Sequence, residues 1–280
     1  MKSAPFKYMR PDTLEEALSV LVEHGEDVRV LAGGQSLGAM LNMRIVTPSI
    51  LLDLNLLTEL SWIEEVRGFL ATAALVRQRD ALDDATVREH IPLLAQALPH
   101  VGHYQTRNRG TLGGSVAHAD PSAEIPLVLA TLGGEVELRT ARQIRRVKAS
   151  QFFRSALVTA REPDELLTAL YWPRRNPAQR SAFVEFAVRE GDFAIVAVAC
   201  TLDAGTLRIG FAGCGETPQI IERTGLVDLD AATIQTIARE ASAGLACQSD
   251  LLGSSEYRRQ LAAVLASKAM SALTRETVHA

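Results

Sequence analysis

Two segments with paired glycines carry residue types that could hold an anion through the backbone. One spans residues 32–36 (Ala-Gly-Gly-Gln-Ser) and the other spans residues 111–115 (Thr-Leu-Gly-Gly-Ser). Glycine has no Cβ atom, so the backbone at each pair can come close to a ligand. Free N–H groups at the start of a helix attract negative charge, and each segment also contributes hydroxyl groups. Two such segments facing each other would hold the neighbouring phosphates of a dinucleotide.

The residues around the first segment predict the elements that position it. A capping box at residues 13–16 begins an amphipathic helix that Gly25 ends. Apolar runs at residues 28–32 and 50–54 predict two buried strands, and a second helical stretch follows the glycines. We therefore expect a small α/β unit with the glycine turn between a strand and a helix. Neither segment matches the P-loop or the Gly-x-Gly-x-x-Gly pattern, which disfavours P-loop and Rossmann sites.

A serine hydrolase is an alternative interpretation of the first segment. Residues 34–38 match Gly-x-Ser-x-Gly, the turn that presents the nucleophile of α/β-hydrolases, and Ser36 would be that nucleophile. Asp53 and His118 follow in the chain order that such a triad requires. The context is unfavourable, because only 33 residues precede the motif and the hydrolase fold needs several strands before it.

A metal-dependent hydrolase is a second alternative. His100, His103, His118 and Asp120 lie within 21 residues, and Glu124 could serve as the general base. A proline and a glycine near the first two histidines disfavour the regular helix that would align them. Asp120 and Glu124 also fit a general acid–base pair, the acidic start of a helix, or a contact to the ribose or ribityl hydroxyls of a cofactor.

The rest of the chain divides into two parts. Residues 56–172 mix short strands with helices, and residues 173–177, with two prolines, are the best candidate for a linker. Beyond it the pattern predicts three antiparallel strands and then two amphipathic helices, at residues 183–188, 195–202, 207–211, 231–245 and 255–273. We therefore expect one domain over residues 1–175, subdivided near residue 55, and a C-terminal α+β domain over residues 178–280.

Composition excludes several classes of protein. The 280 residues are 47% hydrophobic and 22% charged, which is ordinary for a globular protein, and a net charge of −4 argues against a broad nucleic-acid-binding surface. The longest apolar run, residues 193–202, is about half a membrane span. Because the first residues have no apolar signal-peptide core, we expect a cytoplasmic protein without a transmembrane segment. The three cysteines are too few and too scattered for a disulfide framework or a metal cluster.

Three motifs together resemble a known family. Residues 101–124 (VGHYQTRNRGTLGGSVAHADPSAE), residues 32–36 and residues 189–194 (Arg-Glu-Gly-Asp-Phe-Ala) resemble the FAD-binding, or medium, subunit of molybdenum hydroxylases of the carbon monoxide dehydrogenase and xanthine dehydrogenase type. The order and spacing of the motifs agree, and the likeness spans nearly the whole chain. It implies an α+β protein with a two-part FAD-binding domain of the PCMH/vanillyl-alcohol-oxidase type. A smaller C-terminal domain of three-stranded antiparallel sheet plus helices would follow.

The resemblance also implies a set of cofactor-binding residues. The pyrophosphate of FAD would be held from two sides, by Ala32, Gly33, Gly34, Gln35, Ser36, Thr111, Gly113, Gly114 and Ser115. Glu124 matches an acidic position that contacts the cofactor, Asp120 is a further candidate beside it, and Leu167 matches a residue that packs near the flavin. No side chain of this chain would act as an acid–base catalyst or bind a metal ion.

Partner subunits follow from the same resemblance. A large subunit with a molybdenum cofactor would oxidise the substrate, and a small subunit with two [2Fe–2S] clusters would relay electrons to FAD, which passes them to an external acceptor. The complex is expected to be a dimer of such heterotrimers. The sequence departs from some members, because residues 181–186 contain no lysine and instead carry the acidic Glu185. A hydrolase that uses Ser36 or the cluster of His100, His103 and His118 is the alternative hypothesis.

Overall fold

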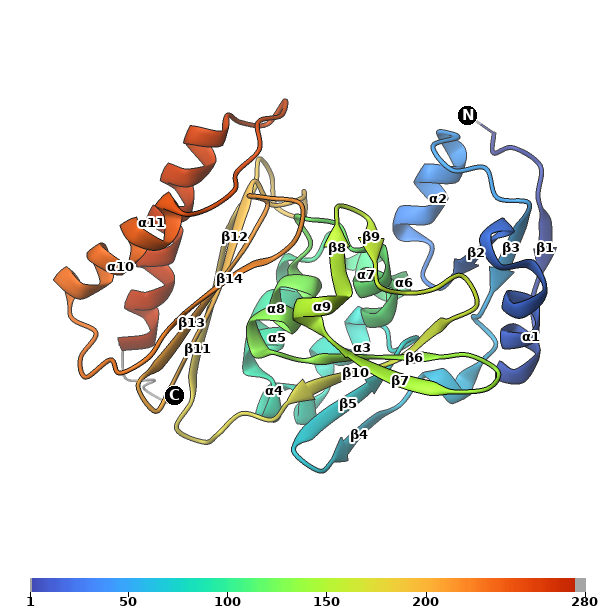
Figure 1. Ribbon diagram of the computed structural model, residues 1–280, viewed down its shortest axis with the longest axis horizontal. Coiled ribbons are helices and arrows are strands. Elements are labelled where there is room, and N and C mark those ends of the chain that lie inside the picture. Colours follow the sequence, from blue (N-terminus) through green and yellow to red (C-terminus); the bar gives the residue numbers. More distant parts are fainter. Residues whose placement is uncertain (1, 275–280) are drawn as a thin grey trace.

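The computed structural model describes residues 2–274 as three consecutive parts that each combine helices with a sheet. Figure 1 shows a small sheet with two helices at one end and a five-stranded sheet with a group of short helices in the middle. A four-stranded sheet backed by two longer helices lies at the other end.

The N-terminal part is built as the sequence predicts. Its parallel strands lie in the order β1-β3-β2, and its elements are β1 (Lys7–Met9), α1 (Leu14–His24), β2 (Val28–Leu31), α2 (Gln35–Asn42) and β3 (Ile50–Asp53). The Thr13 hydroxyl accepts a hydrogen bond from the Glu16 N–H (3.2 Å) and caps α1. Leu14, Leu18 and Leu21 of α1 are buried in the cluster that contains the sheet residues. The glycine turn after β2 therefore has a packed strand behind it and a helix ahead of it.

The central part is an antiparallel sheet in the order β4-β5-β10-β6-β7. Its strands are β4 (Ile63–Val66), β5 (Phe69–Ala73), β6 (Glu135–Arg139), β7 (Ile144–Lys148) and β10 (Leu166–Pro173), and the hairpin of β8 (Phe153–Ser155) and β9 (Val158–Thr159) precedes β10. The middle strand β10 is buried along almost its whole length. On it, Trp172 Nε1 donates to Thr72 Oγ1 (3.0 Å) of β5, which satisfies the one polar atom of the buried indole.

Short helices pack on this sheet, and one of them, α7, begins within the second glycine segment. They are α3 (Gln78–Asp83), α4 (Ala85–His90), α5 (Pro92–Ala97), the 3₁₀ turn η3 (Leu98–His100), α6 (Tyr104–Arg109), α7 (Leu112–His118), α8 (Glu124–Leu132) and α9 (Ala149–Phe152). Pro92 is the first residue of α5, a position that needs no N–H group. α8 is almost entirely buried, because it packs against both the central and the C-terminal sheet.

The C-terminal part corrects one prediction, because its antiparallel sheet has four strands and not three. The strands are β11 (Arg180–Phe186), β12 (Val196–Asp203), β13 (Thr206–Ala212) and β14 (Gln219–Arg223), and the helices are α10 (Ala231–Ala243) and α11 (Ser255–Thr274). β14 is a short edge strand positioned by its pairing with β13, where Ile221 lies opposite Ile209. Its five residues are too few to show an alternating pattern on their own. The three expected strands and both expected helices are present.

A continuous apolar core joins the central and C-terminal parts. Ala197, Ala199 and Ala212 of the C-terminal sheet belong to the same buried cluster as Leu127 and Val128 of α8. A second cluster lies between this sheet and the helices α10 and α11. Both faces of the C-terminal sheet are therefore covered, and its edge strand β11 lies beside α5 of the central part.

Candidate functional site

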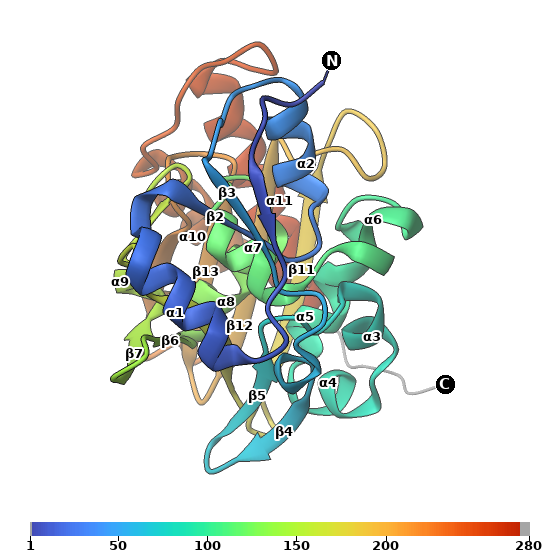
Figure 2. The same cartoon turned by 90° about the vertical axis from the view of Figure 1, so that its right-hand side faces the viewer.

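The two glycine segments lie against each other. A Cβ atom on Gly33 would come within 2.8 Å of Gly110 Cα, and one on Gly114 would lie 3.7 Å from the Cβ atom of Ala32. The absence of a side chain at Gly33 is therefore what allows one segment to approach the other. Figure 2 shows α2 and α7, which begin at the two segments, close to each other beside the small sheet.

The buried Asp53 supports the first segment through Asn55. Asp53 accepts hydrogen bonds from the Tyr8 hydroxyl (2.5 Å) and the Asn55 N–H (2.9 Å), and Asn55 Nδ2 donates to the Ala32 carbonyl (2.9 Å). Burial raises the pKa of Asp53, but the hydrogen bonds from Tyr8 and Asn55 outweigh it, and the net pKa lies below the ordinary value. Asp53 is thus an ionised structural anchor, and its hydrogen-bond partners among the described residues are Tyr8 and Asn55 and not the histidine that a triad with Ser36 requires.

Arg77 connects the two segments directly. Its Nη2 donates to Asn55 Oδ1 (2.6 Å), its Nη1 donates to the Arg109 carbonyl, and its backbone forms a bridge with Thr111. Sequence reasoning missed both Asn55 and Arg77. The position of Asn55 directly after a predicted strand was a signal that could have found it, whereas nothing in the local pattern marks Arg77.

The first segment presents a run of unused backbone donors. Within residues 2–274, the N–H groups of residues 33–37 donate no hydrogen bond, because they precede α2 or form its first turn. Gly34 has a φ of +72°, a conformation that favours glycine, and it directs the chain into α2. Gln35 Nε2 donates to the Gly33 carbonyl (3.0 Å) and closes the turn. These donors fit the negatively charged oxygens of a pyrophosphate group.

The second segment is different from the first. This stretch is the first turn of α7, and its N–H groups are used inside the protein. Gly113 N donates to the Ala74 carbonyl (3.1 Å). Gly114 N donates to Thr111 Oγ1 (3.0 Å), which caps the helix. What this side offers to a ligand is therefore the hydroxyl group of Ser115, because Thr111 is 2% exposed and its Oγ1 caps the helix.

The three other predicted site residues lie at different depths. Glu124, the first residue of α8, is 6% exposed, and burial raises the pKa of its carboxyl to about 8, so it is protonated at neutral pH. Asp120 Oδ1 accepts a hydrogen bond from the Ser122 N–H (2.8 Å) and closes the turn before α8. Leu167 is buried in β10, in the same apolar cluster as Leu112 of α7. Its contribution is apolar packing beneath the second segment.

The histidines of the metal-site alternative do not converge. His100 Nδ1 lies 3.2 Å from Glu185 Oε1, whereas His103 packs against Gly191 and His118 ends α7. In the part of the chain that the structure describes, no three His, Cys, Asp or Glu side chains surround a common point where a metal ion would sit. The geometry therefore gives the metal-dependent alternative no support.

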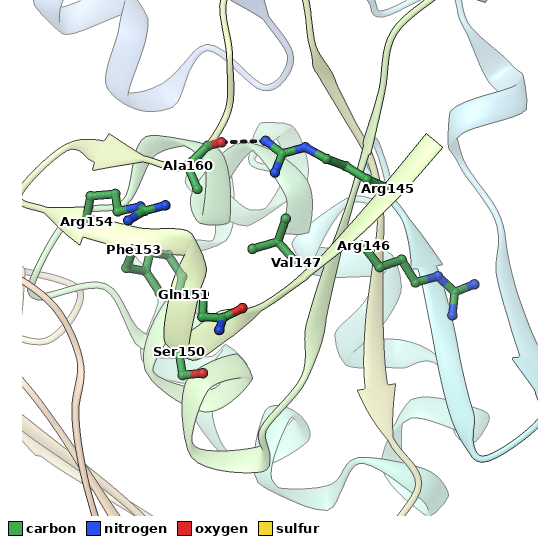
Figure 3. A pocket seen from close by; sticks show the side chains of 8 residues that line it. All are labelled: Arg145, Arg146, Val147, Ser150, Gln151, Phe153, Arg154 and Ala160. Atoms are coloured by element: carbon green, nitrogen blue, oxygen red, sulfur yellow. Dashed lines mark hydrogen bonds between the residues drawn. The ribbon is translucent and has the colours of Figure 1, made fainter. Parts of the chain in front are cut away.

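A separate hollow of about 590 Å³ lies between β7, α9 and β8, away from the glycine segments (Figure 3). Arginines line it, but they are largely engaged. Arg145 pairs with both oxygens of Glu165 (2.5 and 2.8 Å) and donates to the Ala160 carbonyl, and Arg146 points away from the hollow. Arg154 is then the one lining arginine with no bond to another described residue. None of the residues that line this hollow belongs to either glycine segment.

Comparison with known proteins agrees with this geometry. Residues 4–175 match the family described as "FAD binding domain in molybdopterin dehydrogenase", and residues 181–273 match the "CO dehydrogenase flavoprotein C-terminal domain". The chain belongs to this flavoprotein family.

Relatives of this flavoprotein include several medium chains. The caffeine dehydrogenase subunit beta of Pseudomonas sp. (strain CBB1) is 37% identical over 78% of this chain and 76% of its own length. The glyceraldehyde dehydrogenase medium chain of Sulfolobus acidocaldarius is 33% identical over 94% and 96%. Among solved structures, quinoline 2-oxidoreductase from Pseudomonas putida 86 superposes with a TM-score of 0.92 at 36% identity, covering 98% of each chain.

The flavoprotein family confirms the interpretation that the three motifs suggested. The chain is the FAD-binding medium subunit of a molybdenum hydroxylase, an oxidoreductase of several subunits. The hydrolase alternative finds no support in the relatives. Among residues 2–274, none of the helices is both long enough and apolar enough to cross a bilayer.

Proposed function

We propose that residues 33–37 bind the pyrophosphate of FAD through their unused N–H groups. The observation that carries the proposal is the run of consecutive free donors at the start of α2, beside the second glycine segment. The proposed cofactor contacts are those that the resemblance implies, namely Ala32, Gly33, Gly34, Gln35, Ser36, Thr111, Gly113, Gly114, Ser115, Asp120, Glu124 and Leu167. In this set, Gly33 and Gly113 act by allowing close backbone packing.

We further propose that the chain receives electrons from the [2Fe–2S] clusters of the small subunit and passes them to an external acceptor, within a dimer of heterotrimers. FAD supplies this chemistry because a flavin can exchange one electron or two. The protein's part is to bind and orient the cofactor. The protonated Glu124 is a hydrogen-bond donor at neutral pH, and Leu167 provides an apolar surface.

We also propose domain limits at residues 1–175 and 178–280, supported by the passage of the chain between the central and C-terminal sheets at residues 174–179. A cytoplasmic location is part of the same proposal. It is supported by the free thiols of Cys200, Cys214 and Cys247, since unpaired cysteines are typical of a reducing compartment.

The test is FAD binding by the purified full chain and by two variants of one residue. Gln35 is the first residue of α2, a position that accepts proline. Gln35→Pro removes the side chain and one of the proposed N–H donors, whereas the control Gln35→Ala removes the side chain alone. We expect the wild type to bind one FAD, with absorption bands near about 375 and 450 nm, and Gln35→Pro to bind about tenfold more weakly than Gln35→Ala. A wild type that binds no FAD, or equal affinities in the two variants, contradicts the proposal.

A further inference from the structure

Two of the three cysteines lie together in the C-terminal part, although they are distant in the sequence. Cys214 is in the loop after β13, residues 213–218, and Cys247 is in the loop between α10 and α11, residues 244–254. Cys214 is buried in the apolar cluster between the C-terminal sheet and the two helices, and Cys247 is half-buried against the same cluster. Both are free thiols. The fold therefore brings a pair of thiols together at the edge of a core.

Contacts on both sides of the pair hold the two loops together. Gln248 N donates to the Cys214 carbonyl (2.8 Å). A Cβ atom on Gly215 would lie 3.1 Å from the Ala246 carbonyl oxygen, so the residues next to the cysteines also touch. The Cα atoms of Cys214 and Cys247 are each two covalent bonds from the atoms of that hydrogen bond. Their separation is therefore of the order that a disulfide spans, about 4.4–6.8 Å.

A buried arginine connects the same two loops. Arg258 of α11 is 3% exposed. Its guanidinium donates to the Gly213 carbonyl, next to Cys214, and to both carboxyl oxygens of Asp250 (2.6 and 2.7 Å). Because these bonds already hold the loops side by side, joining them covalently needs little movement of the backbone, which is the condition for an unstrained disulfide.

The two thiols differ in their access to an oxidant in solution. Burial raises the pKa of the Cys214 thiol, and the charge and hydrogen bond of the neighbouring Cys247 raise it further. Arg258 and Arg259 of α11 act in the opposite direction. Cys214 is therefore a protonated thiol inside the cluster, whereas Cys247 is partly exposed. An accessible thiol with a second thiol behind it is the arrangement of an attacking cysteine and its resolving partner.

We propose that Cys214 and Cys247 are a redox-active pair that hydrogen peroxide converts into a disulfide. Cys247 attacks the peroxide: an S–O bond forms, the O–O bond breaks, and one water leaves with the thiol proton. The Cys214 sulfur then attacks Cys247, so that the S–S bond forms, the S–O bond breaks, and a second water leaves. The two thiols are oxidised by two electrons, the peroxide is reduced, and a small dithiol reverses the reaction.

The disulfide would tie the loop between α10 and α11 covalently to the loop after β13. In a reducing compartment such a bond is transient, which agrees with the free thiols of the structure. Neither step of the reaction uses the residues proposed to bind FAD, so the inference stands apart from the proposed function.

Peptide mapping of the full chain after treatment with hydrogen peroxide tests the inference. Trypsin places each cysteine in a separate peptide, residues 190–208, 209–223 and 240–258. We expect the last two as one disulfide-linked pair, and the first, with Cys200, as a free thiol. A small dithiol should restore both free peptides. The oxidised chain should unfold at a temperature about 5 °C higher than the reduced chain, since the bond constrains the unfolded state.

Variants of single cysteines test the order of the two steps. Cys214→Ala removes the resolving thiol, so Cys247 should accumulate as a sulfenic acid that dimedone traps, whereas the wild type should give no such adduct. Cys200→Ala is the matched control, because Cys200 is fully buried in β12. It should form the disulfide as the wild type does.

Three results would overturn the inference, and the first two need only the wild-type chain. One is that both peptides stay free, or that Cys247 alone is modified. Another is a disulfide that joins two chains instead of two loops of one chain. The third is an oxidised chain that unfolds at a lower temperature than the reduced chain, because its disulfide would form only in a distorted structure.

Discussion

The two glycine segments have similar sequences but different roles in the structure. In the first, residues 32–36, the segment is half-exposed and its backbone donors are free to meet a ligand. In the second, residues 111–115, and at the start of α8 that follows it, two polar residues are buried: Thr111 is 2% and Glu124 is 6% exposed, and the first N–H groups of α7 bond to the protein itself. A glycine pair therefore indicates that backbones come close to something. Only the surroundings show whether that is a ligand or another part of the chain.

The largest expected effect concerns the buried carboxyl of the second region. The pKa of Glu124 in the folded chain is about 8, above an ordinary value of 4.5, so the folded state holds the proton more tightly than the unfolded state. The stability that this provides is full at acidic pH and is lost as the pH rises to about 8. Without FAD, the unfolding free energy of the wild type should fall relative to Glu124→Gln by on the order of 4 kcal/mol between about pH 5 and about pH 9. Urea unfolding across that range measures it, and parallel curves would contradict the burial argument.

Gly113 tests whether the second glycine pair serves packing. A Cβ atom there would lie 2.6 Å from Ala74 Cα, so Gly113→Ala should lose about 2–3 kcal/mol of stability even without FAD. Gly38 in α2 is the matched control, because a Cβ atom there meets nothing within 4 Å. Gly38→Ala should gain about 0.5–1 kcal/mol through helix propensity. Chemical denaturation of both variants measures their stabilities, and equal stabilities would show that Gly113 is not needed for packing.

Arg77 tests the connection between the two regions. Arg77→Met leaves the Asn55 side-chain oxygen and the Arg109 carbonyl without their donor, and it should cost about 2 kcal/mol of stability and weaken FAD binding. Arg79, two residues on, forms an exposed pair with Asp83 (2.7 Å) and is the control. Arg79→Met should change stability by less than about 0.5 kcal/mol. Thermal unfolding and FAD titration of the two variants separate a bridging arginine from a surface one.

The smallest effects come from removing one hydroxyl on each side. Thr111→Ala deletes the cap of α7 and should cost about 1 kcal/mol of stability without FAD. Ser36→Ala deletes a hydroxyl beside free donors, so it should leave that stability unchanged and lower FAD affinity by about 0.5–1.5 kcal/mol. Measured together, the two variants sharpen the comparison. An equal loss of stability in both would show that the two regions do not differ as described.

Local signals predicted much of the fold because they act within a few residues. The capping box at residues 13–16, the apolar strand that begins at residue 28 and the apolar run of β12 were each confirmed. The predictions of secondary structure failed where a contact between residues distant in sequence determines the local conformation. β14 exists as a strand only because β13 pairs with it, and the stretch after Thr111 is helical because its donors reach Val76 and Ala74 across the chain.

The candidate site divides in the same way. The strand–glycine–helix pattern and the three motifs in order were sufficient to indicate a pyrophosphate site and the flavoprotein family. The bonds that hold the site were not visible, because Asn55 and Arg77 interact with residues distant in sequence. The position of Asn55 directly after a predicted strand was the one local signal, and no local pattern marks Arg77.

By itself, then, the amino-acid sequence determined the order of the elements, the position of the free N–H groups after β2, and the cofactor class. The tertiary structure alone decided that the second glycine pair packs inside the core, that Glu124 is buried deeply enough to stay protonated, and that Glu185 pairs with His100 of a distant segment. The physical reason is that backbone conformation and capping are set by neighbouring residues. Burial and charge interactions depend on which distant segments fold against each other.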